Sequence, residues 1–153
     1  MDGEKAEFKK QKYNHFYMDV AKRVSQMSHA VRLKVGSVLV KNSNIISFGW
    51  NGMPAGWNND CEDIIELHED GGHVLKTKPE VLHSEANCLM KIAKSSISSE
   101  GADLFVTHAP CLDCAKLIYQ SGISRVWYGS AYRDRAGVEF LKHSGVEVEQ
   151  LDT

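Results

Sequence analysis

The second half of the chain alternates helix and strand patterns with short connections, and this alternation limits the folds open to it. Helical patterns at 84–95, 111–122 and 134–145 are each followed by a strand pattern. These strand segments are 103–110, 124–130 and 146–150. A strand, a helix and a further strand in close succession usually place the two strands in parallel, with the helix crossing one face. The pattern predicts an α/β fold with a sheet that is parallel at least in part.

The first half adds one helix and a hairpin. An amphipathic helix is expected from about Tyr13 to Met27, and residues 1–12 are expected to be a charged, frayed lead-in. The segments 35–41 and 45–50 flank the turn "NSN" and are predicted to pair as a hairpin. The complete order, α-ββ-α-β-α-β-α-β, predicts a central sheet covered by helices on both faces, in one domain that spans residues 1–153.

Periodicity stops between these two halves, at residues 53–80. Turn-forming Pro and Gly residues predict a long insertion loop, with at most a short helix near Ile64–His68. Loops of this length in small domains are usually functional or disordered. The segment from Asn58 to His73 holds six acidic residues and no Lys or Arg.

Composition excludes some classes of protein. The net charge of −2 argues against a protein that coats nucleic acid or an anionic membrane. No apolar run approaches the length of a transmembrane helix, and the N-terminal residues lack a signal-peptide core. We therefore expect a cytoplasmic protein, in the host cell if the chain is viral, with no membrane partner. In that compartment thiols stay reduced, so a C-x-x-C pair favours metal binding or catalysis over a structural disulfide.

Two short motifs carry the candidate chemistry. Cys111 and Cys114 lie at the start of a predicted helix, where i, i+3 spacing puts both sulfurs on one face. His83 begins the preceding helix and can supply a third zinc ligand, while Glu85 remains free to move protons. A catalytic zinc has three protein ligands and one open position. A purely structural zinc and a redox C-x-x-C pair are the alternatives.

His83-Ser84-Glu85 followed by Pro110-Cys111-Leu112-Asp113-Cys114 resembles the signature of the zinc-dependent cytidine deaminase superfamily. The element order is similar to that fold over nearly the whole chain. The resemblance implies a three-layer αβα sandwich around a mixed five-stranded sheet. It also implies a Zn²⁺ held by His83, Cys111 and Cys114, with Glu85 as general acid and base.

Three features look most like deoxycytidylate (dCMP) deaminases: the segment 34–56, the long loop before His83, and "GSAYRDRAG" at 129–137. The resemblance implies hydrolysis of dCMP to dUMP and ammonia. It assigns the substrate residues Asn51 (sugar), Arg32, Tyr132 and Arg133 (phosphate) and Ala109. Convergent donors around a phosphate dianion make physical sense, because Arg offers them as a fork. The role of His108 stays open.

The same resemblance implies regulation and assembly. Many members form hexamers that dCTP activates and dTTP inhibits, each with Mg²⁺, which the acidic loop could help to hold. The expected allosteric residues are Gly49, Trp50, Gly52, Met53 and Lys94. A second, structural zinc at Cys61 with His68 or His73 is a further hypothesis, with His29 as an additional candidate ligand.

Alternative functions remain open at this point. They are a bifunctional dCMP/dCTP deaminase, a polynucleotide deaminase acting on tRNA or single-stranded DNA, and a catalytically dead, zinc-stapled sensor of dNTPs. The even charge balance disfavours the extended basic groove that a polynucleotide needs, and Glu85 disfavours a dead module.

Overall fold

The structure is a computed structural model that describes residues 2–132 and 134–151. Eleven helices and strands follow one another in this part of the chain: α1 (Gly3–Ser25), β1 (Gly36–Lys41), β2 (Asn44–Trp50), β3 (Glu62–Leu67), β4 (His73–Thr77), α2 (Ser84–Ala93), β5 (Asp103–His108), α3 (Leu112–Gln120), β6 (Arg125–Ser130), α4 (Ala136–His143) and β7 (Glu147–Gln150).

The central sheet has five strands in the order β2-β1-β5-β6-β7. β1 runs antiparallel to both β2 and β5, whereas β5, β6 and β7 are parallel to one another. The predicted mixed five-stranded sheet is therefore confirmed. Because β5 and β6 are parallel, their C-terminal ends lie side by side, and the last residues, His108 and Ser130, are register partners.

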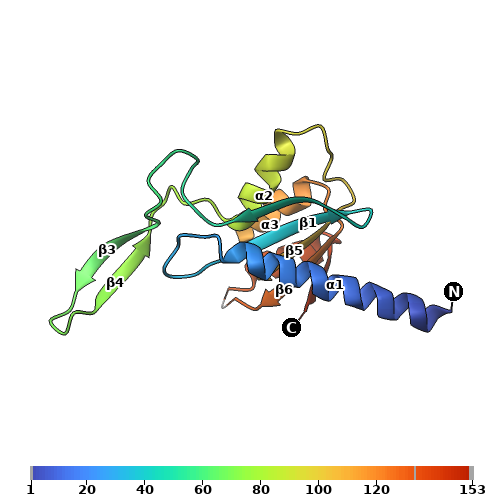
Figure 1. Cartoon of the computed structure of the whole chain (residues 1–153), viewed down its shortest axis with the longest axis horizontal. Helices are drawn as coiled ribbons and strands as arrows, with labels where there is room; N and C mark the ends of the chain where they lie inside the picture. Colours follow the sequence, from blue (N-terminus) through green and yellow to red (C-terminus); the bar gives the residue numbers. More distant parts are fainter. Residues whose placement is uncertain (1, 133, 152–153) are drawn as a thin grey trace.

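Helices cover both faces of this sheet (Figure 1). α1 packs on one face through Met18 and Ala21, against Val38 of β1 and Phe105 of β5. The other face carries α2, α3 and α4 over residues such as Leu39. Val38 and Leu39 are neighbours in sequence and face opposite layers, as the two-residue period of a strand requires. The three-layer αβα arrangement is thus built from strands that are buried on both faces.

The N-terminal expectation is wrong, because α1 begins at Gly3 and includes the residues that were expected to fray. The Asp2 carboxylate caps this helix by accepting a hydrogen bond from the Lys5 N–H at 2.9 Å. The first turns are almost entirely exposed, so they lack the apolar face by which a sequence pattern identifies a helix.

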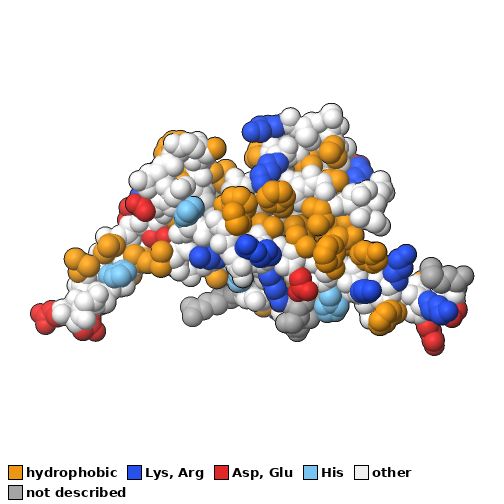
Figure 2. All heavy atoms as spheres, viewed as in Figure 1, with side chains coloured by type: hydrophobic (Ala, Val, Ile, Leu, Met, Phe, Trp, Pro, Cys, Tyr) orange, Lys and Arg blue, Asp and Glu red, His pale blue; other side chains and the backbone are white. Residues whose placement is uncertain are grey.

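The insertion 53–80 also differs from expectation, since β3 and β4 form an antiparallel hairpin where a loop with a short helix was predicted. The hairpin projects away from the sheet (Figure 1). It exposes the apolar residues Ile64, Ile65, Leu67 and Val74. Figure 2 shows hydrophobic side chains along this projecting hairpin and acidic side chains toward its tip.

Among the described residues, the structure contains no helix with the length and apolar character needed to cross a membrane.

Candidate active site

Three metal-binding side chains meet where α2 and α3 begin. His83 is the N-cap residue of α2, and Cys111 is the N-cap residue of α3. The Nδ1 atom of His83 lies 3.4 Å from the sulfur of Cys111 and 3.4 Å from that of Cys114. The three donor atoms all lie within 4.8 Å of one another. Cys111 and Cys114 follow His83 by 28 and 31 residues in the sequence, and the fold brings the three side chains together.

The Cys111 and Cys114 thiols shift each other's pKa in opposite directions. Hydrogen bonds from Cys114 and from His83 lower the pKa of Cys111 to about 4. The same interaction with Cys111, together with burial, raises the pKa of Cys114. The start of α3 also favours the thiolate through its dipole. A bound zinc ion would hold both sulfurs as thiolates.

Close backbone contacts fix the two helix starts. A Cβ atom on Gly137 of α4 would lie 2.7 Å from the carbonyl carbon of Cys111, so only glycine lets α4 approach this loop. On the other side, Gly52 and Leu82 exchange backbone hydrogen bonds at 3.1 and 2.9 Å. This bridge holds the residue next to His83.

Glu85 lies in the first turn of α2 and is only 4% exposed. The Ser84 hydroxyl donates a hydrogen bond of 2.7 Å to its carboxylate. Burial raises the pKa of Glu85, and the bond from Ser84 opposes part of that shift. A carboxyl group with a raised pKa can both accept and return a proton near neutral pH.

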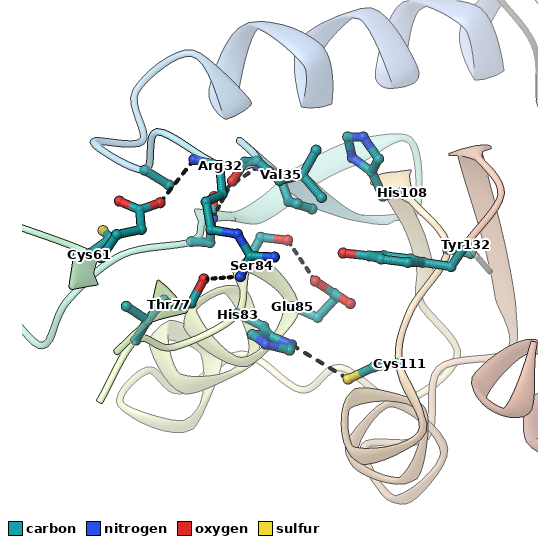
Figure 3. A pocket seen from close by; sticks show the side chains of 16 residues that line it. Arg32, Val35, Cys61, Thr77, His83, Ser84, Glu85, His108, Cys111 and Tyr132 are labelled. Atoms are coloured by element: carbon teal, nitrogen blue, oxygen red, sulfur yellow. Dashed lines mark hydrogen bonds between the residues drawn. The ribbon is translucent and has the colours of Figure 1, made fainter. Parts of the chain in front are cut away.

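His83, Cys111 and Glu85 border a cavity of about 260 Å³ (Figure 3). Sixteen residues line it: Ala30, Arg32, Leu33, Val35, Asn51, Cys61, Glu62, Thr77, Val81, His83, Ser84, Glu85, His108, Ala109, Cys111 and Tyr132. All the predicted substrate residues that the structure describes are in this set. Glu62, Thr77 and Ser84 are additions that the sequence did not reveal.

Asn51 lines the cavity and also supports its wall. Its Oδ1 accepts the Val35 N–H at 2.8 Å, and its Nδ2 donates to the Leu33 carbonyl at 2.8 Å. One amide hydrogen remains for a ligand. Asn51 therefore organises the segment between α1 and β1 and can still reach into the cavity.

Arg32 is held in place by the hairpin. Its Nη1 donates to the Thr77 hydroxyl at 3.2 Å, and Figure 3 shows its guanidinium among the labelled cavity residues. Its backbone N–H and that of Val31 both donate to Glu62, at 2.9 Å each. Thr77 and Glu62 are register partners in the hairpin, so β3 and β4 form one wall of the cavity.

Tyr132 and His108 lie at the opposite wall. Their ring centroids are 6.3 Å apart, and Figure 3 shows the Tyr132 hydroxyl directed toward the cavity. His108 Nδ1 lies 2.9 Å from the Thr107 hydroxyl, and burial lowers the pKa of His108. Ala109 is buried and donates its N–H to Ser130 at 2.8 Å. Arg133 lies outside the described residues.

The second-zinc hypothesis is not supported by the geometry. His83, Cys111 and Cys114 form the one group of three or more potential metal-binding residues within 2–132 and 134–151. Cys61 is buried at the base of the hairpin, while His73 pairs with Leu67 at the far end of β3. A strand of this length spans roughly 20 Å, which separates Cys61 from both His68 and His73.

Gly49 and Trp50, two of the residues expected to act in regulation, contact α2. A Cβ atom on Gly49 would collide with the start of α2 near Ser84 and Cys88. The Trp50 carbonyl accepts a hydrogen bond from Asn87 at 2.8 Å. Met53 follows the Gly52 bridge, and Lys94 is the C-cap residue of α2. These contacts connect β2 to the helix that carries His83 and Glu85.

Comparison with known proteins agrees with this geometry. The profile of the "cytidine and deoxycytidylate deaminase zinc-binding region" matches residues 11–130. The chain belongs to this family. It is 33% identical over 165 aligned positions to the deoxycytidylate deaminase of Enterobacteria phage T4, covering 86% of each chain. It is 36% identical over 117 positions to human deoxycytidylate deaminase, covering 75% of this chain and 63% of the human one.

A solved structure from this deaminase family matches over its full length. The dCMP deaminase of cyanophage S-TIM5, in complex with dCMP and dUMP, has 45% sequence identity and a TM-score of 0.78, and 99% of each chain is covered. The His and Cys donors fit the family's zinc, because one imidazole and two thiolates are a usual set for a catalytic zinc with an open position.

Proposed function

We propose that this protein hydrolyses dCMP to dUMP and ammonia. The observation that carries the proposal is the buried Glu85 beside three converging zinc donors, in a cavity that also contains Arg32. The similarity to dCMP deaminases supports the choice of substrate. The reaction adds one water to the pyrimidine carbon that bears the amino group and releases that group as ammonia.

His83, Cys111 and Cys114 would hold the zinc ion. When bound, zinc supplies a Lewis acid that lowers the pKa of a coordinated water to about 7. Glu85 accepts a proton at its carboxylate and delivers it to the ring nitrogen of the base. It then accepts a second proton, from the hydroxyl that the water has left on the same ring carbon, and transfers it to the departing amino group, so one carboxylate serves both halves of the reaction. Ser84 orients the carboxylate by its hydrogen bond at 2.7 Å.

The rest of the cavity would hold the nucleotide. Arg32, positioned by Thr77, offers a charged fork to the 5′-phosphate. Asn51 offers its remaining amide hydrogen to the sugar, and Tyr132 and Arg133 are proposed as further phosphate contacts.

Regulation and assembly remain predictions from the family. We expect dCTP with Mg²⁺ to activate and dTTP with Mg²⁺ to inhibit a hexameric enzyme, through the segment that includes Gly49, Trp50, Gly52 and Met53. Activity on dCMP that does not change with saturating dTTP and Mg²⁺ would contradict this regulation. Light scattering of the purified protein measures the oligomeric state.

One substrate panel tests the proposed function. Zinc-loaded protein is offered dCMP, dCTP, deoxycytidine and a cytosine-containing oligonucleotide in separate reactions, and ammonia release is measured. We expect turnover of dCMP with the highest kcat/KM. Turnover of the oligonucleotide alone would favour a polynucleotide deaminase, and no turnover of any substrate would favour a dNTP sensor.

A further inference from the structure

Glu62 places a carboxylate in the wall of the cavity next to Arg32. It is the first residue of β3, and it is partly buried. Its Oε2 accepts the backbone N–H groups of Val31 and Arg32, each at 2.9 Å. Two consecutive N–H groups that point to one oxygen are an arrangement that proteins also use to bind phosphate. In this chain a side chain of the protein occupies that position.

The charge of Glu62 is not matched by an ion pair. No Lys, Arg or His nitrogen of residues 2–132 and 134–151 lies within the 4.0 Å ion-pair distance of its carboxylate. Arg32 instead directs Nη1 to the neutral hydroxyl of Thr77 at 3.2 Å. The cavity therefore offers a cationic group and, beside the backbone of the same residue, an anionic one.

This arrangement suits a ligand with a single phosphate. The Arg32 guanidinium can bind one phosphate through paired hydrogen bonds. A chain of three phosphates bound at that guanidinium would bring further negative charge toward Glu62, which lines the same cavity. At roughly 6 Å and an effective dielectric of about 20, the repulsion of two unit charges corresponds to about a hundredfold in affinity. Salt reduces this value in an open cavity.

We propose that Glu62 restricts this site to nucleoside monophosphates by holding an anionic group where the second and third phosphates of a triphosphate would lie. The proposal rests on the proposed deamination of dCMP and deepens it by naming the residue that selects dCMP over dCTP. It assigns Glu62 to specificity, whereas Glu85 and the zinc donors carry the chemistry.

The test compares Glu62→Gln with Glu66→Gln in zinc-loaded protein. The first change keeps an oxygen for the Val31 and Arg32 N–H groups and removes the charge. The second removes the same charge from an exposed residue of the same strand that does not line the cavity. kcat/KM is measured for dCMP and for dCTP in separate reactions without added divalent cation, and dUMP and dUTP are quantified by chromatography.

We expect Glu62→Gln to raise the ratio of kcat/KM for dCTP to that for dCMP at least tenfold, and Glu66→Gln to leave it within twofold. A rise smaller than threefold in Glu62→Gln, or an equal rise in Glu66→Gln, overturns the proposal. A wild type that uses dCTP as well as dCMP overturns it too. Absence of dCMP turnover in the wild type refutes the proposed function instead, so the two failures are distinguishable.

Glu62→Asp distinguishes the effect of the carboxylate charge from that of the hydrogen bonds that support the backbone. It also provides a second test of the proposal if Glu62→Gln does not fold. Aspartate keeps the charge but shortens the side chain that holds the backbone of Val31 and Arg32. We expect it to raise KM for dCMP and to keep the preference for dCMP over dCTP within threefold of wild type. A loss of preference as large as the tenfold change expected for Glu62→Gln means that side-chain geometry sets specificity and overturns the role of the charge.

Discussion

Gly137→Ala is expected to disturb the zinc site from outside the cavity. An added Cβ would lie 2.7 and 2.8 Å from the carbonyl carbon and oxygen of Cys111, and it would meet the carbonyl oxygen of Pro110 more closely still. Cβ atoms in proteins essentially never approach within 3.0 Å of such atoms, and 3.4 Å marks ordinary contact. The loop that carries Cys111 must therefore move by about 0.7 Å or more.

The magnitude follows from two opposing effects. Overpacking typically costs about 1–3 kcal/mol, and replacing a helical glycine by alanine returns about 0.5–1 kcal/mol. We expect a net loss of about 1–2 kcal/mol, which lowers Tm by about 2–8 °C in a domain of this size. Metal–ligand distances tolerate only about 0.2 Å, so zinc affinity should fall about tenfold or more.

Thermal unfolding and competition with a zinc chelator measure these two quantities. Gly3→Ala is the matched control, because it also lies in the first turn of a helix and its added Cβ meets no atom within 4 Å. We expect the control to keep the Tm and zinc affinity of the wild type or slightly raise its Tm. A Gly137→Ala protein with unchanged Tm and unchanged zinc affinity would refute the packing argument.

Three further changes test individual contacts. Cys114→Ser should reduce bound zinc to a small fraction per chain by elemental analysis and abolish dCMP turnover; full zinc content would show that the sulfur is not a ligand. Asn51→Ala removes partners of Leu33 and Val35 and should cost about 1–3 kcal/mol in urea unfolding, whereas an unchanged midpoint would contradict the support role. Thr77→Val removes the hydrogen bond that positions Arg32, and so weakens binding of the substrate and of the transition state equally. We therefore expect KM for dCMP to rise about threefold to tenfold and kcat to stay within twofold. A fall in kcat alone would contradict this reasoning.

The zinc site was predictable from sequence because each of its parts is local. His83 and Glu85 are two residues apart, Cys111 and Cys114 are three apart, and each pair begins a helix whose periodicity is clear. The alternating strands and helices of the second half then leave few ways to place the two helix starts. The parallel part of the sheet could be predicted from the same alternation, whereas the order of the strands came from the structure.

The hairpin wall was not predictable in this way. Residues such as Ile64 and Leu67 are exposed in its strands. The sequence of these strands therefore lacks the regular alternation of apolar and polar residues that identifies a half-buried strand. Glu62 and Thr77 become neighbours only through pairing across the hairpin. The start of α1 was missed because its first turns have few apolar residues and form no apolar face, although Asp2 is a residue type that favours the N-cap position.

The central claim is that Glu85 moves the protons of a zinc-dependent hydrolysis and does not bind the metal. Glu85→Gln keeps the shape of the side chain and cannot accept a proton, so zinc content and dUMP formation are measured together in this variant. We predict one zinc per chain, as in the wild type, and a loss of turnover of about 10²–10⁴-fold. Turnover within tenfold of the wild type, or loss of zinc together with activity, would contradict the account.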